Sequence, residues 1–170
     1  MNELSRLTNE DKDARERIES AAADMLARTC AWSDMNTGSW NIDGLNAFSG
    51  VLANAFSELD ADIRLQEAPG FDTIDSSGNV QTIHTAPILR ASARTAAPVQ
   101  VVLTGHYDTV FPKGTFEGVT DLGDGRFNGP GLADMKGGLC VMLEALKAFE
   151  AGPFRDRLGY QIVITPDEEI

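Results

Sequence analysis

Three short segments of the chain contain residue types that could carry out metal-assisted chemistry. The first, residues 105–110, reads GHYDTV and places His106 and Asp108 directly after an apolar run. If strand geometry persists there, both side chains project to the same side, and a carboxylate can accept the second ring N–H of an imidazole. That contact would fix the tautomer of a metal-ligating histidine. Taken alone, this segment is explained more simply by a structural histidine beside a turn aspartate.

The second segment, residues 129–138, reads GPGLADMKGG and places Asp134 where the chain turns into an expected helix. Aspartate is among the best helix N-cap residues, which would explain Asp134 but not the four glycines around it. Gly137 and Gly138 in a first helical turn cost about 1 kcal/mol each relative to alanine, so we expect a close approach to the backbone there. A phosphate cradle is an alternative, although the pattern matches neither the P-loop nor the dinucleotide fingerprint. A cap role and a ligand role for Asp134 both stay open.

The third segment is the run Asp167, Glu168 and Glu169, which follows an apolar stretch. Three consecutive carboxylates usually form a solvated surface turn. At the carboxyl end of a strand, however, they would lie near His106 if the two strands are neighbours, and adjacent carboxylates can serve as a metal ligand and a general base. Mixed nitrogen and oxygen ligands suit zinc, and less selectively cobalt or manganese. The second histidine, His84, has no acidic neighbour in sequence and is expected at the surface.

Hydrophobic periodicity predicts the elements that would position these segments. Helical spacing of apolar residues predicts helices over residues 11–32, 44–59 and 135–151, with Asp43 as the N-cap of the second. Apolar runs and alternation predict strands at residues 61–67, 71–74, 80–84, 87–93, 98–104 and 158–165. The run at 98–104 is typical of a central strand covered on both faces. We therefore expect an α/β fold in which helices flank a mostly parallel, mixed sheet, with the site beyond the carboxyl ends of its strands.

The composition limits the class of protein. The chain has 170 residues, of which 42% are hydrophobic and 24% charged, as in ordinary globular domains. Its formal charge of -12 argues against binding to nucleic acid or to an anionic membrane. The two cysteines, Cys30 and Cys140, are too few for a disulfide scaffold and are expected to be small buried residues. Residues 1–17 contain no signal core and no long apolar run occurs, so we expect a cytoplasmic protein.

The three segments, in this order and each after the expected element, resemble the co-catalytic zinc peptidases and deacylases. That family includes glutamate carboxypeptidase, aminoacylase, acetylornithine deacetylase and succinyl-diaminopimelate desuccinylase. The loop at residues 36–39 also fits, and residues 110–115 are most similar to the glutamate carboxypeptidase branch. The resemblance implies a hydrolase that cleaves a C-terminal peptide bond or an N-acyl amino acid. It also implies a helix-flanked catalytic sheet and a smaller lid domain that commonly dimerises.

The same resemblance implies a role for each site residue. The metal ligands that it implies are His106, Asp134 and Glu169. Asp134 would bridge two divalent metal ions, zinc by preference, with cobalt or manganese as alternatives. Asp108 would orient His106, and Glu168 would act as the general base toward a metal-activated water. A cis peptide bond between Asp134 and Met135 is also implied.

The family needs one further carboxylate ligand and a second histidine ligand, and we expect both beyond Ile170, together with the lid domain. The chain stops directly after a strand-to-loop turn, where domains seldom end. Residues 1–170 are therefore expected to be the N-terminal part of a metallopeptidase catalytic domain. We expect a small peptide or N-acyl amino acid as substrate and a homodimeric full-length protein.

Two other functions stay open. A non-catalytic or inactive fragment of the same fold could act as a binding or scaffold protein, although the intact set of site residues disfavours it. A phosphate- or nucleotide-binding domain would rest on the glycines of residues 129–138 alone.

Overall fold

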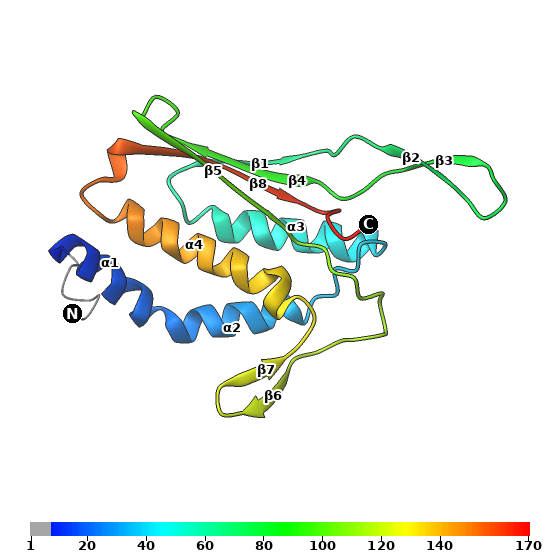
Figure 1. Ribbon diagram of the computed structural model, residues 1–170, viewed down its shortest axis with the longest axis horizontal. Helices are drawn as coiled ribbons and strands as arrows, with labels where there is room; N and C mark the ends of the chain where they lie inside the picture. Colours follow the sequence, from blue (N-terminus) through cyan, green and yellow to red (C-terminus); the bar gives the residue numbers. More distant parts are fainter. Residues whose placement is uncertain (1–7) are drawn as a thin grey trace, which may run out of the picture.

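A mixed four-stranded sheet with helices packed on one side forms the body of the molecule (Figure 1). The computed structural model describes residues 8–170. Residues 1–7, which belong to the N-terminal segment where no signal core is expected, lie outside the described residues. Across the sheet, the strands are β1 (Asp62–Gln66), β4 (Ile88–Ala93), β8 (Leu158–Thr165) and β5 (Val99–His106). The helices are α1 (Asn9–Ser20), α2 (Ala22–Ser33), α3 (Ile42–Phe56) and α4 (Gly137–Glu150), with a short 3-10 turn at Arg155–Arg157. The predicted α/β class, a mixed sheet flanked by helices, is confirmed.

Two hairpins project from this body within the described residues (Figure 1). They are β2 (Phe71–Ile74) with β3 (Val80–Ile83), and β6 (Thr120–Gly123) with β7 (Arg126–Asn128). The first hairpin lies between β1 and β4 in sequence, so no helix connects these two strands. A connection without a helical crossover favours antiparallel pairing. Accordingly β1–β4 is antiparallel. β4–β8 is also antiparallel and only β5–β8 is parallel, so the sheet is less parallel than the sequence predicts.

The parallel β5–β8 pair positions the site. His106 at the end of β5 lies opposite Thr165 at the end of β8. The backbone N–H of Tyr107 continues the pairing by donating to the Thr165 carbonyl at 2.9 Å. The chain segments that leave the two strands therefore start side by side, as expected for the carboxyl ends of neighbouring parallel strands.

The covering of β5 differs from the prediction. Leu103 packs against the core, but Val102 is 65% exposed and Val99 is 49% exposed. Within residues 8–170, β5 is the last strand at one side of the sheet, and the helices cover one face only (Figure 1). The expectation of a central strand covered on both faces is therefore wrong for this part of the chain.

Helix boundaries also differ from the prediction. The helix expected over residues 11–32 is two helices, and the break falls at Ala21, whose N–H is shared among the carbonyls of Arg17, Ile18 and Glu19. Helix α3 is capped by Asn41 rather than Asp43, because the Asn41 side chain accepts from the Gly44 N–H at 3.2 Å. No helix within residues 8–170 combines enough length and apolar character to cross a bilayer.

Helix α4 begins at Gly137, and Asp134 does not cap it. The backbone of Asp134 is extended, with φ -129° and ψ 100°, and the position before the helix is taken by Lys136. A Cβ atom on Gly137 would lie 2.4 Å from the Leu132 carbonyl oxygen, so only glycine fits there. The glycine is thus explained by packing within the turn, and the cap role for Asp134 is wrong.

The hydrophobic core lies between the sheet and α2, α3 and α4. Its fully buried members alternate along β4 and β8 and recur at helical spacing on α3 and α4. The largest apolar members are Phe48, Phe56, Leu45, Leu52, Leu89, Leu139, Leu143, Ile162 and Ile164. Cys140 is buried and Cys30 is half-buried, and both are free thiols.

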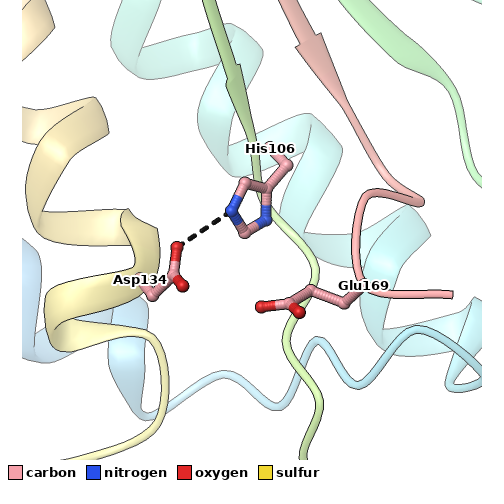
Figure 2. A group of neighbouring side chains, drawn as sticks. All are labelled: His106, Asp134 and Glu169. Carbon is pink, nitrogen blue, oxygen red and sulfur yellow. Dashed lines mark hydrogen bonds and ion pairs between the residues drawn. The ribbon is translucent and has the colours of Figure 1, made fainter.

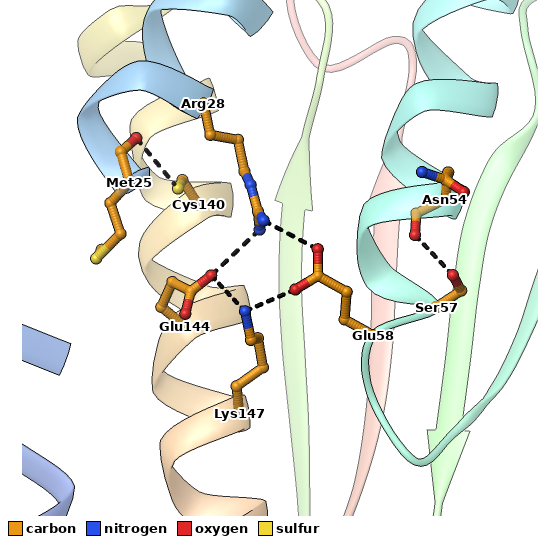
Figure 3. Close-up of polar contacts among 8 residues, drawn as sticks. All are labelled: Met25, Arg28, Asn54, Ser57, Glu58, Cys140, Glu144 and Lys147. Carbon is orange, nitrogen blue, oxygen red and sulfur yellow. Dashed lines mark hydrogen bonds and ion pairs between the residues drawn. The ribbon is translucent and has the colours of Figure 1, made fainter. Parts of the chain in front are cut away.

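A ring of four alternating charges links α2, α4 and the segment that follows α3 (Figure 3). Arg28 of α2 donates to Glu58 at 2.9 Å and to Glu144 of α4 at 3.2 Å. Lys147 of α4 donates to the same two carboxylates at 2.6 and 2.9 Å. Partial burial alone would raise the pKa of Glu58, but the hydrogen bond from Lys147 and the charge of Arg28 outweigh it and lower that pKa. The ring therefore stabilises the folded state most when Glu58 is ionised.

Glu58→Gln is expected to lower the free energy of unfolding by about 1 kcal/mol at neutral pH, since two partly exposed ion pairs are lost. Because the pKa of Glu58 is lowered on folding, the stabilisation is present above the ordinary value of 4.5 and is lost as the pH falls through the folded value. Urea unfolding of both proteins near pH 7 and near pH 3 measures this difference. Glu19→Gln, which removes an exposed pair with Arg15, is the matched control and should matter little at either pH. An equal Glu58 effect at both pH values would contradict the prediction.

Candidate metal centre

Three side chains from distant parts of the sequence converge at the carboxyl ends of β5 and β8 (Figure 2). His106 ends β5, Asp134 lies in the turn before α4, and Glu169 lies in the turn after β8. One ligand atom from each lies within 4.8 Å of the other two. One imidazole nitrogen and two carboxylate oxygens form a donor set that fits zinc or a similar divalent ion. The residues present therefore fit the metal that the family resemblance implies.

The imidazole of His106 is held from both sides. Its Nδ1 lies 3.2 Å from Asp108 Oδ1, and its Nε2 lies 3.0 Å from Asp134 Oδ1. Because a carboxylate oxygen accepts, the tautomer that fits this contact carries its proton on Nδ1, toward Asp108. This arrangement leaves Nε2, on the side of Asp134, for either a second proton or a metal ion. Asp108 thus holds His106 in the orientation that a metal-ligating histidine needs.

Asp108 also organises the turn that follows β8. Its side chain is fully buried, and Oδ1 accepts from the Glu168 N–H at 3.2 Å. Its second oxygen, Oδ2, accepts from the Glu169 N–H at 3.0 Å and from the Ser39 hydroxyl at 2.8 Å. A single buried carboxylate therefore joins the histidine, the Glu168–Glu169 turn and the loop before α3.

The electrostatic field at this centre is negative. Burial alone would lower the pKa of His106, but the hydrogen bond to Asp134 and the charges of Asp108, Glu168 and Asp134 outweigh it, so the pKa is raised. Partial burial and the charge of Asp134 raise the pKa of Glu169. Both shifts mean that the site attracts positive charge, which a proton or a divalent cation can supply.

Glu168 lies beside the three converging side chains without being one of them. Its Oε2 is 4.0 Å from His106 Nε2, and 61% of its side chain is exposed. A carboxylate in that position can reach a water molecule at the centre, which is what a general base requires. The predicted division of roles between Glu168 and Glu169 is compatible with this placement and stays a prediction.

The structure also shows the Asp134–Met135 peptide bond, the position of His84 and the reason why the site residues converge. The peptide bond between Asp134 and Met135 is cis. His84 is exposed after β3, as expected for a surface residue. The parallel pairing of β5 with β8 brings His106 and the Glu168–Glu169 turn together, and Asp134 joins them from the turn before α4.

Two buried polar residues near the centre were not singled out by the sequence. Ser39 completes the contacts of Asp108. Lys136 is fully buried, and its Nζ donates to the carbonyls of Trp32 at 3.0 Å and Met35 at 2.7 Å, at the end of α2. Burial lowers the pKa of Lys136 to about 7. Both contacts bridge residues far apart in sequence, so local patterns carry no signal for them.

Ser39→Ala is expected to weaken zinc binding about tenfold, because Asp108 loses a donor that holds its carboxylate in place. Competition titration against a chromophoric zinc chelator measures the dissociation constant without any assay of turnover. Ser49→Ala is the matched control, since it removes a buried hydroxyl that donates only to the Asn46 carbonyl on α3. Zinc binding by Ser39→Ala that equals that of the control would show that Ser39 does not support the centre.

The three segments that form this centre lie in a part of the chain that is similar to known proteins. Residues 102–170, which contain all three, match the model of peptidase family M20/M25/M40. Over 77 residues, the chain is 38% identical to succinyl-diaminopimelate desuccinylase 2 of Shewanella loihica, covering 42% of this chain and 20% of that protein. The predicted family resemblance is confirmed. The glutamate carboxypeptidase branch within this family stays a prediction.

Solved structures show the same fold as the chain. Human carnosine dipeptidase 1 superimposes with a TM-score of 0.74 and 18% identity, over 96% of this chain and 36% of that one. The dipeptidase Dug1p of Saccharomyces cerevisiae superimposes with a TM-score of 0.71 and 15% identity, over 90% of this chain and 34% of that one. The chain thus spans about a third of these structures and about a fifth of the desuccinylase. At these identities, the structural likeness concerns the fold alone.

Proposed function

We propose that the protein is a metal-dependent hydrolase that cleaves an amide bond, either a C-terminal peptide bond or the bond of an N-acyl amino acid. The observation that carries this proposal is the convergence of His106, Asp134 and Glu169 around a negative centre. The relationship to family M20/M25/M40 supports amide hydrolysis in general. A small peptide or N-acyl amino acid is the proposed substrate.

In the proposed mechanism, His106, Asp134 and Glu169 hold the metal centre. A divalent ion bound there would polarise the amide carbonyl and lower the pKa of a water molecule. Glu168 accepts a proton from that water as its oxygen adds to the carbonyl carbon. Glu168 then donates the proton to the amide nitrogen as the C–N bond breaks, which releases an amine and a carboxylic acid that carries the second proton of the water until it ionises. Asp108 keeps His106 and the Glu168–Glu169 turn in position throughout.

We propose two metal ions, zinc by preference, which His106, Asp134 and Glu169 would help to hold; Asp134 could serve both, since a carboxylate offers two oxygens. Residues 8–170 provide three converging ligands, so a further carboxylate and a second histidine would come from outside the described part. We propose that residues 1–170 are the N-terminal part of the catalytic domain and that the full-length protein is a homodimer in the cytoplasm. The free thiols of Cys30 and Cys140 are compatible with a reducing compartment.

Metal analysis combined with an activity assay tests the proposal. The full-length protein is stripped with a chelator, reloaded with zinc, and assayed for amine release from a panel of dipeptides and N-acyl amino acids. We expect two zinc ions per chain and amine release that disappears on chelation and returns with zinc. Protein that binds no zinc tightly would contradict the proposal, and zinc binding without amine release across the panel would favour the non-catalytic binding protein.

A further inference from the structure

A cavity of 330 Å³ opens directly beside the metal centre, and Glu169 forms part of its wall. The other walls come from the loop between α2 and α3, which contains Trp40, and from the segment after β5, which contains Val110, Pro112 and Lys113. Glu169 belongs both to the converging ligands and to this wall. A group bound in the cavity would therefore lie next to the bond that the centre hydrolyses.

The floor of the cavity is fixed by backbone pairing. The Ser39 N–H donates to the Thr109 carbonyl at 3.1 Å, and the Thr109 N–H donates to the Thr37 carbonyl at 2.9 Å. The two segments approach so closely at Gly38 that a Cβ atom there would lie 2.4 Å from the Phe111 carbonyl oxygen. Because the segments are held together in this way, the cavity is preformed and needs no rearrangement before a ligand enters.

Two polar side chains in the wall, Ser39 and Asn41, already have partners, whereas within residues 8–170 the buried Thr109 hydroxyl and the Lys113 and Glu169 side chains form no hydrogen bond. The Ser39 hydroxyl donates to Asp108. The Asn41 side chain accepts from the Gly44 N–H and donates to the Asn36 carbonyl. The surface left for a ligand is mainly apolar, and its largest parts are Trp40, which is 63% exposed, and Val110, which is 57% exposed. Exposed aromatic and branched side chains gathered in one cavity indicate a binding site for an apolar group.

We propose that this cavity binds an apolar, and best an aromatic, side chain of the amide substrate, with Trp40 as the residue that determines this specificity. The inference rests on the proposed function, because it names the class of substrate for the same centre. A cavity of about 150 Å³ accommodates benzene, so the larger volume here holds one aromatic ring but not a long peptide. An indole face is well suited to stacking against such a ring.

Two measurements test the inference. In the zinc-loaded full-length protein, Trp40→Ala should lower the ratio of kcat/KM for N-acetyl-phenylalanine to kcat/KM for N-acetyl-glycine about tenfold. The second measurement uses metal-free protein with Trp32→Phe, which leaves Trp40 as the tryptophan within residues 1–170. Adding 3-phenylpropionamide should shift the fluorescence of Trp40 in a saturable way. Adding propionamide should not. Trp40 is exposed, so its replacement should leave the core intact.

Val80→Ala shortens an exposed apolar side chain on β3, outside the cavity wall, and is the control that should leave the phenylalanine-to-glycine ratio unchanged. The inference is overturned if Trp40→Ala leaves that ratio unchanged, or if 3-phenylpropionamide gives no saturable shift. It is also overturned if the protein prefers N-succinyl substrates and Lys113→Gln removes this preference, because the cavity would then take an acidic group. If no amide is hydrolysed, the proposed function fails, while the fluorescence titration still decides whether the cavity binds an aromatic group.

Discussion

Glu168→Gln is expected to lower turnover by about a hundred- to ten-thousand-fold while zinc stays bound. The glutamine keeps the shape of the side chain but cannot accept the proton of the attacking water. His106, Asp134 and Glu169 are untouched, and the backbone N–H of residue 168 still donates to Asp108. Zinc analysis and steady-state kinetics on the same preparation of full-length protein measure both quantities.

Glu169→Gln is the matched comparison, because the same chemical change is made one residue along. This variant removes an anionic oxygen from the converging ligands. Metal content should therefore fall, and excess zinc should restore part of the activity. If Glu168→Gln loses metal while Glu169→Gln keeps it, the two roles are reversed. If neither change affects turnover, the centre proposed here is not the active site.

Asp108→Asn is expected to weaken zinc binding by about 10- to 100-fold and to lower the free energy of unfolding by about 2 kcal/mol. Each carboxylate oxygen of Asp108 accepts from two donors. A carboxamide presents an NH2 group in place of one oxygen, so two of those donors would face another donor in a buried site. Chelator competition and urea unfolding of the zinc-free protein measure the two effects separately.

Asp167→Asn serves as the control for this experiment, because it neutralises a carboxylate in the turn next to Asp108. Partial burial and the charge of Asp108 raise the pKa of Asp167, so its ionised form is already disfavoured. Its replacement should lower neither zinc affinity nor stability. Asp108→Asn protein that behaves like this control would show that the contacts of Asp108 contribute little to the centre.

The sequence predicts the elements of the site well where local patterns decide the structure. The strand expected at residues 158–165 is β8, because an apolar run there ends at Pro166, which cannot continue the strand. The convergence of His106 with the Glu168–Glu169 turn follows from placing both at the carboxyl ends of neighbouring parallel strands. These features depend on residue type and order along the chain.

Other features depend on contacts that the sequence does not display. The helix break falls at Ala21, a residue that favours helix, so no Gly or Pro marks it. Asn41 and Asp43 are equally good cap residues by type, and only the Asn41 contact with Gly44 distinguishes them. A lysine is expected at the surface by its type, yet Lys136 is buried against the carbonyls of Trp32 and Met35, about a hundred positions earlier. Tertiary packing decides each of these cases.

The two edge strands of the sheet differ in how readily each would pair with a strand of another molecule. Strand β1 carries Asp62 and Arg64, and charged side chains discourage pairing with a foreign strand. Strand β5 has no charged residue from Val99 to Gly105, and within residues 8–170 nothing pairs with its outer side. The N–H and C=O groups on that side form a template on which a further strand can add, whether from the rest of the full-length protein or from another molecule. The charge of -12 opposes such self-association by repulsion, and salt, which screens charges beyond about 10 Å at 0.1 M, is expected to promote it.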